Sequence, residues 1–312
     1  MKVLIPEKFS QDGVAVLEQA GIDVTFKPDT TPEQLLDMIG DYDGLIVRSA
    51  TTVTRAVIER GAKLKIIGRA GVGVDNIDRE AATERGIIVC NAPFSNIVSA
   101  AEQTMALMLA VARNTAAADA SMKGGAWNRS AFTGTELMDK TLGIFGTGHV
   151  GLLVAERAKA FGMQLIGYDP YCPAERAAEY GITLYDDIIE VCKRSNVITL
   201  HMPKTPETTN MIGAEQLAAM PQGAIVLNVA RGGLIDLDAL AAAIESGHIG
   251  GAGVDVWEHE PVSDSPLHGL ERVVLTPHLG ASTKEAQTRA ATQIAEYVIA
   301  GLEGKDVQTA VK

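Results

Sequence analysis

Aromatic residues and cysteines are scarce in this chain of 312 residues. Phe, Trp and Tyr make up only 4% of it, although 46% of the residues are hydrophobic. Aliphatic side chains and alanine must therefore fill the core, as in α/β proteins. The three cysteines, Cys90, Cys172 and Cys192, are widely scattered. Their spacing indicates neither a disulfide framework nor a zinc site, and we expect no metal.

Positive charge and long apolar runs are also lacking. The formal charge of −12 argues against nucleic acids and anionic membranes as partners. An anionic small molecule would need a local cluster of arginines to bind against this field. The longest apolar run, Met105–Ala112, is far too short to span a bilayer. The first residues, Met1–Phe9, predict a strand and not a signal peptide, so we expect a cytoplasmic protein.

Strand and helix patterns alternate along the chain, whose length suggests two domains. In the first third, strands are expected at Lys2–Ile5, Ile22–Phe26, Gly44–Val47, Lys65–Gly68 and Ile87–Cys90. After residue 140, they are expected at Thr141–Phe145, Met163–Asp169, Val197–Leu200, Ala224–Val229, Gly251–Val256 and Arg272–Thr276. This alternation predicts parallel sheets covered by helices.

Capping patterns predict where several helices begin. Thr31–Gln34 is a capping box with proline at the first helical position. Ser99–Glu102 predicts the start of a long helix that reaches about Ala118, either a plain buried helix or one that joins two domains and packs in a dimer. Ser282–Glu285 predicts the start of a final helix that ends near Glu303. Further helices are expected at 186–193, 214–220 and 237–246.

A glycine-rich turn is the central motif of the sequence. A strand precedes Gly146-x-Gly148-x-x-Gly151, and a helix with one broad apolar face follows it, closed by Gly162. The first glycine permits the tight turn, the second lets a pyrophosphate approach the backbone, and the third lets helix and strand pack closely. The helix N-terminus then offers free N–H groups to the phosphates. A βαβ unit without a ligand is the structural alternative.

An acid ends the strand that follows this helix. Asp169 lies 18 residues beyond Gly151 (169 − 151), where a carboxylate can accept hydrogen bonds from the hydroxyls of an adenosine ribose. It would also repel a 2′-phosphate by roughly 1–4 kcal/mol at about 4 Å, depending on the local dielectric. The sequence therefore predicts that NAD is bound and NADP is not.

Three polar residues follow expected strands in the second half of the chain. Arg231, Glu260 and His278 each come shortly after one strand, and loops at the carboxyl ends of parallel strands gather over the nucleotide crevice. Arg231 can hold a carboxylate and the adjacent carbonyl by a planar fork. His278 can exchange a proton with an alcohol, and Glu260 can fix its tautomer. Asp255 could orient the nicotinamide by accepting from its carboxamide.

Each of these residues also has a structural reading. A lone histidine after Thr-Pro is more often a hydrogen-bonded structural residue, and an arginine in a glycine-rich turn is usually a surface ion-pair partner. The other histidines keep the structural reading here; they are His149, His201, His248, His259 and His268.

Several strings, taken in order, form a distinctive set. They are RSATTVT (48–54), GRAGVGVDNID (68–78), GTGHVG (146–151), YDP (168–170), ARGG (230–233), GVDVWEHEP (253–261) and PHLGASTKEAQ (277–287). Together they resemble the D-isomer-specific 2-hydroxyacid dehydrogenases over essentially the whole chain. The resemblance implies a Rossmann-type doubly wound parallel sheet, inserted into a smaller flavodoxin-like α/β domain.

The resemblance also implies a domain plan and a set of binding residues. A discontinuous substrate-binding domain would comprise 1–96 and 283–312, and an NAD-binding domain 97–282, with homodimers or possibly tetramers forming. Cofactor contacts are implied for Gly146, Gly148, His149, Val150, Gly151, Asp169, Ala230, Asp255 and Gly280. Substrate contacts are implied for Arg48, Ser49, Arg69, Gly71, Val72, Gly73, Arg129, Arg231 and His278, of which Arg129 could act across the dimer interface. The arginines supply the positive cluster that the acidic composition demands.

The implied reaction is reversible hydride transfer at C2 of a small anionic 2-hydroxy acid, first of all 3-phospho-D-glycerate. Another acid, such as 3-sulfolactate or glycerate, stays open, and an NADH-sensing interaction protein is the alternative from another class. Three departures from the family pattern stand out: His149 where arginine is common, and Val72 and Met202 where hydroxyl residues are common. Longer relatives continue beyond residue 312 into serine-sensing domains, so we expect no serine feedback through such a domain here.

Overall fold

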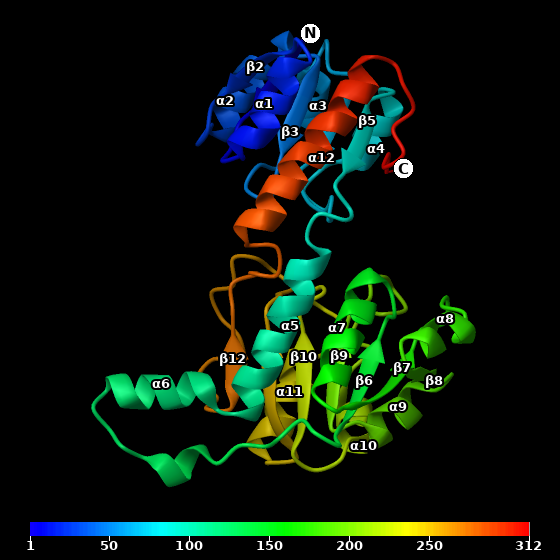
Figure 1. The fold of residues 1–312 in the computed structure, drawn as a ribbon. Coiled ribbons are helices and arrows are strands. Elements are labelled where there is room, and N and C mark those ends of the chain that lie inside the picture. Colours follow the sequence, from blue (N-terminus) through cyan, green and yellow to red (C-terminus); the bar gives the residue numbers. More distant parts are fainter. Residues whose placement is uncertain (312) are drawn as a thin grey trace. The chain divides into compact units, whose positions relative to one another are not determined.

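The computed structural model describes residues 1–311, which form two compact units. Unit 1 combines Met1–Asn96 with the segment from Ala281 onward, and unit 2 is Ile97–Gly280. The chain re-enters unit 1 two residues earlier than the sequence suggested. Each unit is a parallel sheet with helices on both faces (Figure 1), which confirms the expected fold class.

Unit 1 contains a five-stranded sheet in the order β2-β1-β3-β4-β5, the flavodoxin-like order. Its strands are β1 (Lys2–Ile5), β2 (Asp23–Phe26), β3 (Gly44–Val47), β4 (Ile66–Arg69) and β5 (Ile88–Asn91). Its helices are α1 (Gln11–Gln19), α2 (Pro32–Met38), the 3-10 turn η1 (Ile39–Asp41), α3 (Arg55–Arg60), α4 (Arg79–Glu84) and α12 (Lys284–Leu302). Thr31 caps α2 through the expected capping box.

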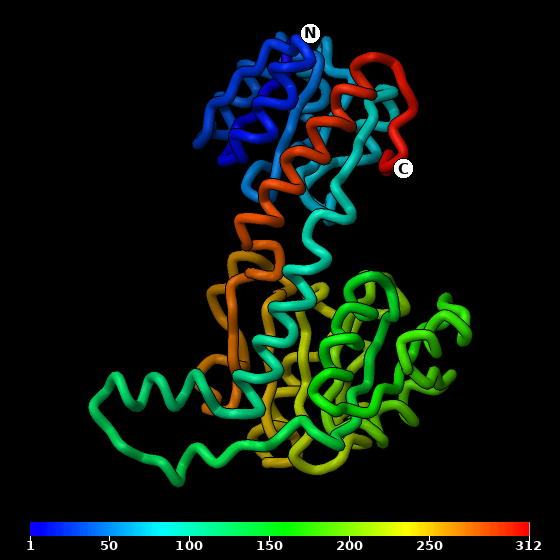
Figure 2. The backbone as a smooth tube through the Cα atoms, in the orientation of Figure 1, coloured from blue at the N-terminus to red at the C-terminus, as the bar shows by residue number. Residues whose placement is uncertain are grey.

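The last helix is part of the core of unit 1. α12 and α1 cover one face of the sheet, and α2, α3 and α4 cover the other. Glycines in the strands make room for α12, since a Cβ on Gly68 would lie 2.6 Å from Val298 Cγ2. After α12 the chain returns to the sheet of unit 1 (Figure 2). There Ala310 bridges Cys90 in antiparallel fashion. The amino- and carboxyl-terminal segments therefore form one folding unit.

Unit 2 contains a seven-stranded parallel sheet in the order β12-β11-β10-β9-β6-β7-β8. Its strands are β6 (Thr141–Phe145), β7 (Gln164–Tyr168), β8 (Ile182–Leu184), β9 (Val197–Leu200), β10 (Ala224–Asn228), β11 (Ile249–Val254) and β12 (Val273–Leu275). Its helices are α5 (Ile97–Ala112), α6 (Thr115–Lys123), η2 (Arg129–Phe132), α7 (His149–Ala160), α8 (Ala174–Glu179), α9 (Ile188–Arg194), α10 (Ala214–Ala219) and α11 (Leu237–Glu245). The strand order reverses direction next to β6, which makes its carboxyl end a topological switch point.

Both faces of this sheet are packed. α5, α7 and α8 bury their apolar sides on one face, and α9, α10 and α11 on the other. The two interior thiols, Cys90 in unit 1 and Cys192 in α9, are buried, and this burial raises the pKa of each thiol to about 12. Within the described residues, no helix is long and apolar enough to cross a membrane.

The start and the length of α5 differ from the sequence prediction. The helix begins at Ile97, so Ser99 lies inside it and is buried instead of capping it. It ends at Ala112, because Asn114 adopts a left-handed conformation with φ of 52° and separates α5 from α6. The prediction of a capping box at Ser99 and a continuous helix to Ala118 was therefore wrong. The run of Ala, Leu and Met residues favours a continuous helix, and it gives no sign that Asn114 ends α5 by adopting a left-handed conformation.

Two further differences concern the short elements α8 and β8 and the first residue of α12. α8 and β8 were not predicted, because six and three residues are too few to show a periodicity. At α12, Thr283 and not Ser282 is the N-cap, with its side chain accepting from the backbone N–H of Ala286.

The turn between β6 and α7 depends on glycine for a different reason at each position. Gly146 has φ of +92°, and a Cβ there would lie 2.7 Å from the carbonyl oxygen of His201. A Cβ on Gly151 would overlap the carbonyl oxygen of Gly146, so the helix approaches the strand end closely. A Cβ on Gly148, by contrast, would meet nothing within 4 Å.

This contrast predicts opposite outcomes for two alanine substitutions in one motif. Gly151→Ala must displace backbone and should lower the free energy of unfolding by about 3 kcal/mol. Gly148→Ala should cost less than about 1 kcal/mol, the usual penalty for alanine at an N-cap. Urea denaturation of both variants measures the difference, and equal losses would contradict the packing described here.

Candidate active site

All the strand ends that carry predicted site residues of unit 2 lie at one edge of its sheet. The strands are parallel throughout, so the glycine turn after β6, Asp169 after β7, and the loops after β10, β11 and β12 all leave from the carboxyl edge. Arg231, Glu260 and His278 follow three neighbouring strands of the sheet. The backbone therefore gathers these residues beside the topological switch point.

The carboxylate of Asp169 is fastened to the glycine turn. Its Oδ2 accepts from the backbone N–H of Thr147 at 2.7 Å and from the hydroxyl of the same residue at 3.0 Å. Its Oδ1 accepts from the N–H of Tyr171 at 3.0 Å, which leaves one acceptor position on this oxygen. Sequence reasoning missed Thr147, although it stands between the first two glycines. The open side of Gly148 and the aligned carboxylate fit a dinucleotide at this turn.

The imidazole of His278 and the carboxylate of Glu260 are in direct contact. Nδ1 of His278 lies 2.7 Å from Oε2 of Glu260, while Oε1 accepts from the backbone N–H of Trp257 at 3.0 Å. The glutamate is thus held by its own loop, and it holds the proton of the ring on Nδ1. Nε2 is left to exchange a proton with a ligand.

The loop of His278 is built on a buried carboxylate. Asp255 is fully buried; its Oδ1 accepts from the hydroxyl of Thr276 at 2.5 Å and from the N–H of Leu279 at 2.7 Å, and its Oδ2 from the N–H of Gly280 at 2.8 Å. His278 itself has φ of 55°, and its N–H donates to the carbonyl of Asp255 at 2.8 Å. These bonds make Asp255 the anchor of the segment that carries the imidazole, a role that sequence reasoning did not assign to it.

The turn of Arg231 packs against the loop that carries Glu260. A Cβ on Gly232 would overlap the backbone of Trp257, so the two loops touch through their main chains. The side chain of Asn228 braces the turn by donating to the carbonyl of Arg231 at 2.8 Å and accepting from the N–H of Ala230 at 3.0 Å. The guanidinium donates to the carbonyl of Ala230 at 2.7 Å. Arg231 and the Glu260–His278 pair are therefore parts of one connected framework.

The predicted substrate residues of unit 1 lie at the carboxyl edge of its own sheet. Arg48 and Ser49 follow β3, and Arg69 ends the neighbouring strand β4. Gly71 has φ of +153°, and a Cβ there would overlap the guanidinium of Arg69, which lies over the glycine. The adjoining 71–73 backbone is tied to the end of β5 by Asn91, whose Nδ2 donates to a carbonyl at 2.6 Å.

Arg129 lies in an arm of unit 2. α6 and η2 extend away from the sheet of that unit (Figure 1), and α6 contains no buried residue. Trp127, next to the arm's arginine, is 81% exposed, and Met122 is also exposed.

The residues that depart from the family pattern are accommodated without strain. Met202 is buried, and its Cγ would lie 2.8 Å from a Cβ on Gly146, so it packs under the glycine turn. His149 is the first residue of α7 and is exposed. The carbonyl of Val72 accepts the bond from Asn91 described above.

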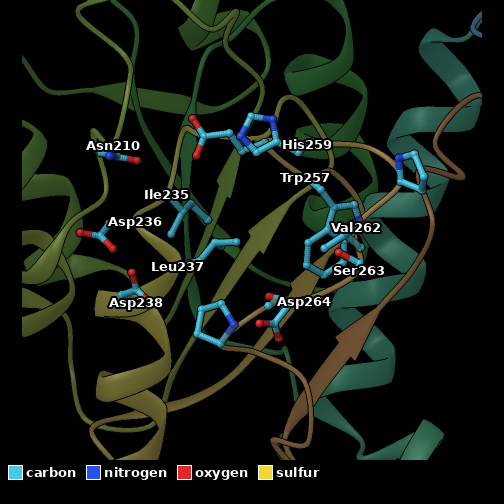
Figure 3. Close-up of a pocket in the computed structure, with 15 residues that line it drawn as sticks. Asn210, Ile235, Asp236, Leu237, Asp238, Trp257, His259, Val262, Ser263 and Asp264 are labelled. Atoms are coloured by element: carbon cyan, nitrogen blue, oxygen red, sulfur yellow. The ribbon is translucent and has the colours of Figure 1, made fainter.

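A hollow of about 500 Å³ lies beside the loops of Arg231, Glu260 and His278, but these three residues do not line it. It is bounded by the loop after β11 and the start of α11 (Figure 3). Asp236, Asp238, Glu258 and Asp264 line it, whereas Arg231, Glu260 and His278 do not. Four carboxylates make it unsuited to an anionic acid.

His201, which follows β9, also lies at the carboxyl edge. Desolvation of its imidazole lowers the pKa of His201 to about 3, so the ring is neutral near physiological pH. Its Nε2 lies 3.0 Å from Oγ1 of Thr199, and its N–H donates to the carbonyl of Phe145 at 2.7 Å. This histidine is a structural residue behind the glycine turn.

Comparison with known families identifies the fold of unit 2. Residues 105–280 match the model of the D-isomer specific 2-hydroxyacid dehydrogenase, NAD binding domain. Among solved structures, a protein from Thermus thermophilus is 35% identical, with a TM-score of 0.90 and full coverage of both chains. D-lactate dehydrogenase from Escherichia coli is 27% identical, with a TM-score of 0.88 and the same coverage.

Curated proteins give higher identities. D-3-phosphoglycerate dehydrogenase from Methanocaldococcus jannaschii is 53% identical over 311 residues, which are 100% of this chain and 59% of that protein. The enzyme of the same name from Mycobacterium leprae is 51% identical over 312 residues, 99% of this chain and 58% of that protein. The chain thus spans less than two thirds of the length of these relatives.

The lowered pKa of His201 predicts a pH-dependent stability. In the unfolded chain, His201 binds a proton as the pH falls through about 6.5, whereas in the folded chain it binds one only near pH 3. The stability is therefore complete above about pH 6.5 and is lost as the pH falls, by about 2 kcal/mol at pH 5. His201→Gln should abolish this part of the loss, measured by urea denaturation at pH 7 and pH 5. His259→Gln, at an exposed histidine, is the control, and an unchanged pH slope in His201→Gln would contradict the assignment.

Proposed function

The chain belongs to the D-isomer specific 2-hydroxyacid dehydrogenase family, and from this premise we propose that it oxidises 3-phospho-D-glycerate to 3-phosphooxypyruvate with NAD⁺. This reaction is the first step of serine synthesis. The single observation that carries the proposal is the contact of 2.7 Å between His278 and Glu260, at the sheet edge that also bears the dinucleotide turn. The relatives named phosphoglycerate dehydrogenase support the choice of acid.

In this reaction the protein moves one proton and orients one acid. When bound, NAD⁺ accepts the hydride that leaves C2. Nε2 of His278 takes the proton of the C2 hydroxyl, and Glu260 keeps the ring in the required tautomer through Nδ1. Arg231 holds the substrate carboxylate by its planar fork. In the reverse direction the same imidazole gives its proton to the forming alkoxide.

The cofactor is held mainly by backbone groups. The N-terminus of α7 offers N–H groups to the pyrophosphate, and the bare face of Gly148 leaves room for its approach. The remaining acceptor position of Asp169 receives a ribose hydroxyl. Val150 and Ala230 flank the cofactor, and Gly280 belongs to the loop anchored by Asp255.

Unit 1 acts as the substrate-binding domain, with Arg48, Ser49, Arg69 and the 71–73 backbone facing the acid. Arg129 reaches the substrate of a partner subunit in a homodimer, an arrangement supported by the exposed arm with Trp127 at its end. The enzyme works in the cytoplasm, which agrees with three free cysteines.

Removal of the imidazole tests the acid–base role. His278→Ala should lower kcat by roughly 10²–10⁴, the usual contribution of a general acid–base group, while the affinity for NADH stays within a few fold. Turnover is followed by NADH absorbance and affinity by fluorescence titration. His259→Ala, an exposed histidine beside Glu260, is the matched control. Survival of turnover in His278→Ala would remove the acid–base assignment.

Replacement of the ribose carboxylate tests the choice of cofactor. Asp169→Ala should raise the ratio of kcat/KM for NADP⁺ over NAD⁺ by at least tenfold, because a repulsion of roughly 1–4 kcal/mol is removed. Thr147→Val removes one hydrogen bond to the same carboxylate but keeps its charge, and should retain the preference for NAD⁺. A ratio unchanged in Asp169→Ala would count against the proposed contact.

A further inference from the structure

Unit 1 contains a cationic pocket that extends beyond the substrate residues proposed above, of which only Arg48 lines it. It is a hollow of about 350 Å³, and its polar lining comes from Lys8, Ser10, Arg48, Lys284, Gln287 and Thr288. All of these residues belong to unit 1. Lys8 follows β1, Arg48 follows the neighbouring strand β3, and the other three residues Lys284, Gln287 and Thr288 lie in the first two turns of α12. The pocket is thus built jointly by the two ends of the chain.

The three cations of the pocket are not neutralised. Among the described residues, no acidic side chain lines the pocket, and Lys8, Arg48 and Lys284 form no ion pair within 4.0 Å. The nearby Asp12 accepts hydrogen bonds from the hydroxyls of Ser10 and Thr288. Lys8 and Lys284 are exposed and Arg48 is half-buried, so three unpaired cations stand together around one hollow and give a protein of net charge −12 a local positive site for an anion.

The arginine of this pocket is held in place by a buried glutamate. Glu7 is 8% exposed; its Oε1 accepts from the N–H groups of Arg48 at 2.7 Å and Thr51 at 3.1 Å, and its Oε2 from Ala50 at 3.2 Å. Three backbone donors thus occupy this carboxylate and keep it from pairing with the cations. The guanidinium of Arg48 donates to the carbonyl of Lys8 at 3.2 Å, which fixes it at the wall of the pocket. The positive charge of Arg48 is therefore held at the pocket by a loop that Glu7 orders.

The chemistry of the lining selects the class of anion. Lysine ammonium and arginine guanidinium groups both bind phosphate oxygens, and three positive charges around one hollow match a doubly charged phosphate better than a singly charged carboxylate. α12 adds the partial positive charge of its N-terminus. We propose that Lys8 and Lys284, together with Arg48, form a binding site for a phosphate dianion. This inference rests on the proposed function in one respect, since the expected bearer of the phosphate is the substrate.

Direct binding tests the site without any turnover. Inorganic phosphate is titrated into the full chain by calorimetry, and the double variant Lys8→Gln with Lys284→Gln should bind it at least tenfold more weakly. Lys63→Gln, an exposed lysine paired with Asp41 outside the pocket, is the matched control and should bind as wild type does. Equal affinity in the double variant, or no phosphate binding by the wild-type chain at millimolar concentration, would overturn the proposal.

Kinetics then identify the source of the phosphate. If the substrate supplies it, Lys284→Gln should raise the KM for 3-phospho-D-glycerate about tenfold, the effect of about 1.4 kcal/mol, and inorganic phosphate should compete with this substrate. The ratio of kcat/KM for phosphoglycerate over glycerate should fall in the variant. If free phosphate is the ligand, the variants lose phosphate binding while KM is unchanged and competition is absent. Phosphate binding without any oxidation of phosphoglycerate would reject the proposed function and leave the site standing.

Discussion

The parallel direction of all seven strands in unit 2 is the constraint on which its site depends. Parallel strands send every βα loop to the same edge, so residues more than a hundred positions apart in sequence are collected without any long-range pairing of side chains. The order of the strands adds a second condition. Because it reverses beside β6, the helices that follow β6 and β9 lie on opposite faces, and the glycine turn stands at the switch point between them. The loops that carry Arg231, Glu260 and His278 follow the strands on one side of this point.

Hydrogen bonds at the carboxyl edge of the sheet hold the loops that follow β11 and β12 in place. Asp255 holds the segment from Thr276 to Gly280, and Nε1 of Trp257 donates to the carbonyl of Thr276 at 3.2 Å. The backbone N–H of the same tryptophan orients Glu260, which in turn orients the imidazole. A proton-transfer group must be placed to within a fraction of an ångström. The placement of His278, the group proposed to transfer the proton, comes from the buried carboxylate of Asp255 and from Trp257, neither of which is a proposed reacting group.

Features of the backbone that repeat along the sequence, such as strands and glycine turns, could be predicted. Most contacts made by a single side chain could not. The β-branched strands and the three glycines have local signatures, so the sheets and the turn were predictable, as was the contact of Glu260 with His278 from the ordered motifs. Ser99 misled because a capping box shows only residue types, and the buried position of a serine depends on packing. Thr147, Glu7 and Thr276 carry no periodic signal. Their roles come from where distant strands bring a carboxylate beside a backbone N–H.

The distribution of charge follows from the same architecture. At the glycine turn the structure offers phosphates the N–H groups of α7, and the nearest ionised side chain fastened to that turn is the acid Asp169. In unit 1 the situation is reversed, because backbone N–H groups are occupied by Glu7 and the cations beside them are left unpaired. The proposed sites of this protein of net charge −12 thus accommodate phosphate in two ways, by oriented amides in unit 2 and by side-chain charge in unit 1. Because the amides act equally on any dinucleotide, the proposed roles assign the discrimination between cofactors to Asp169 and the discrimination between acids to the cations of unit 1.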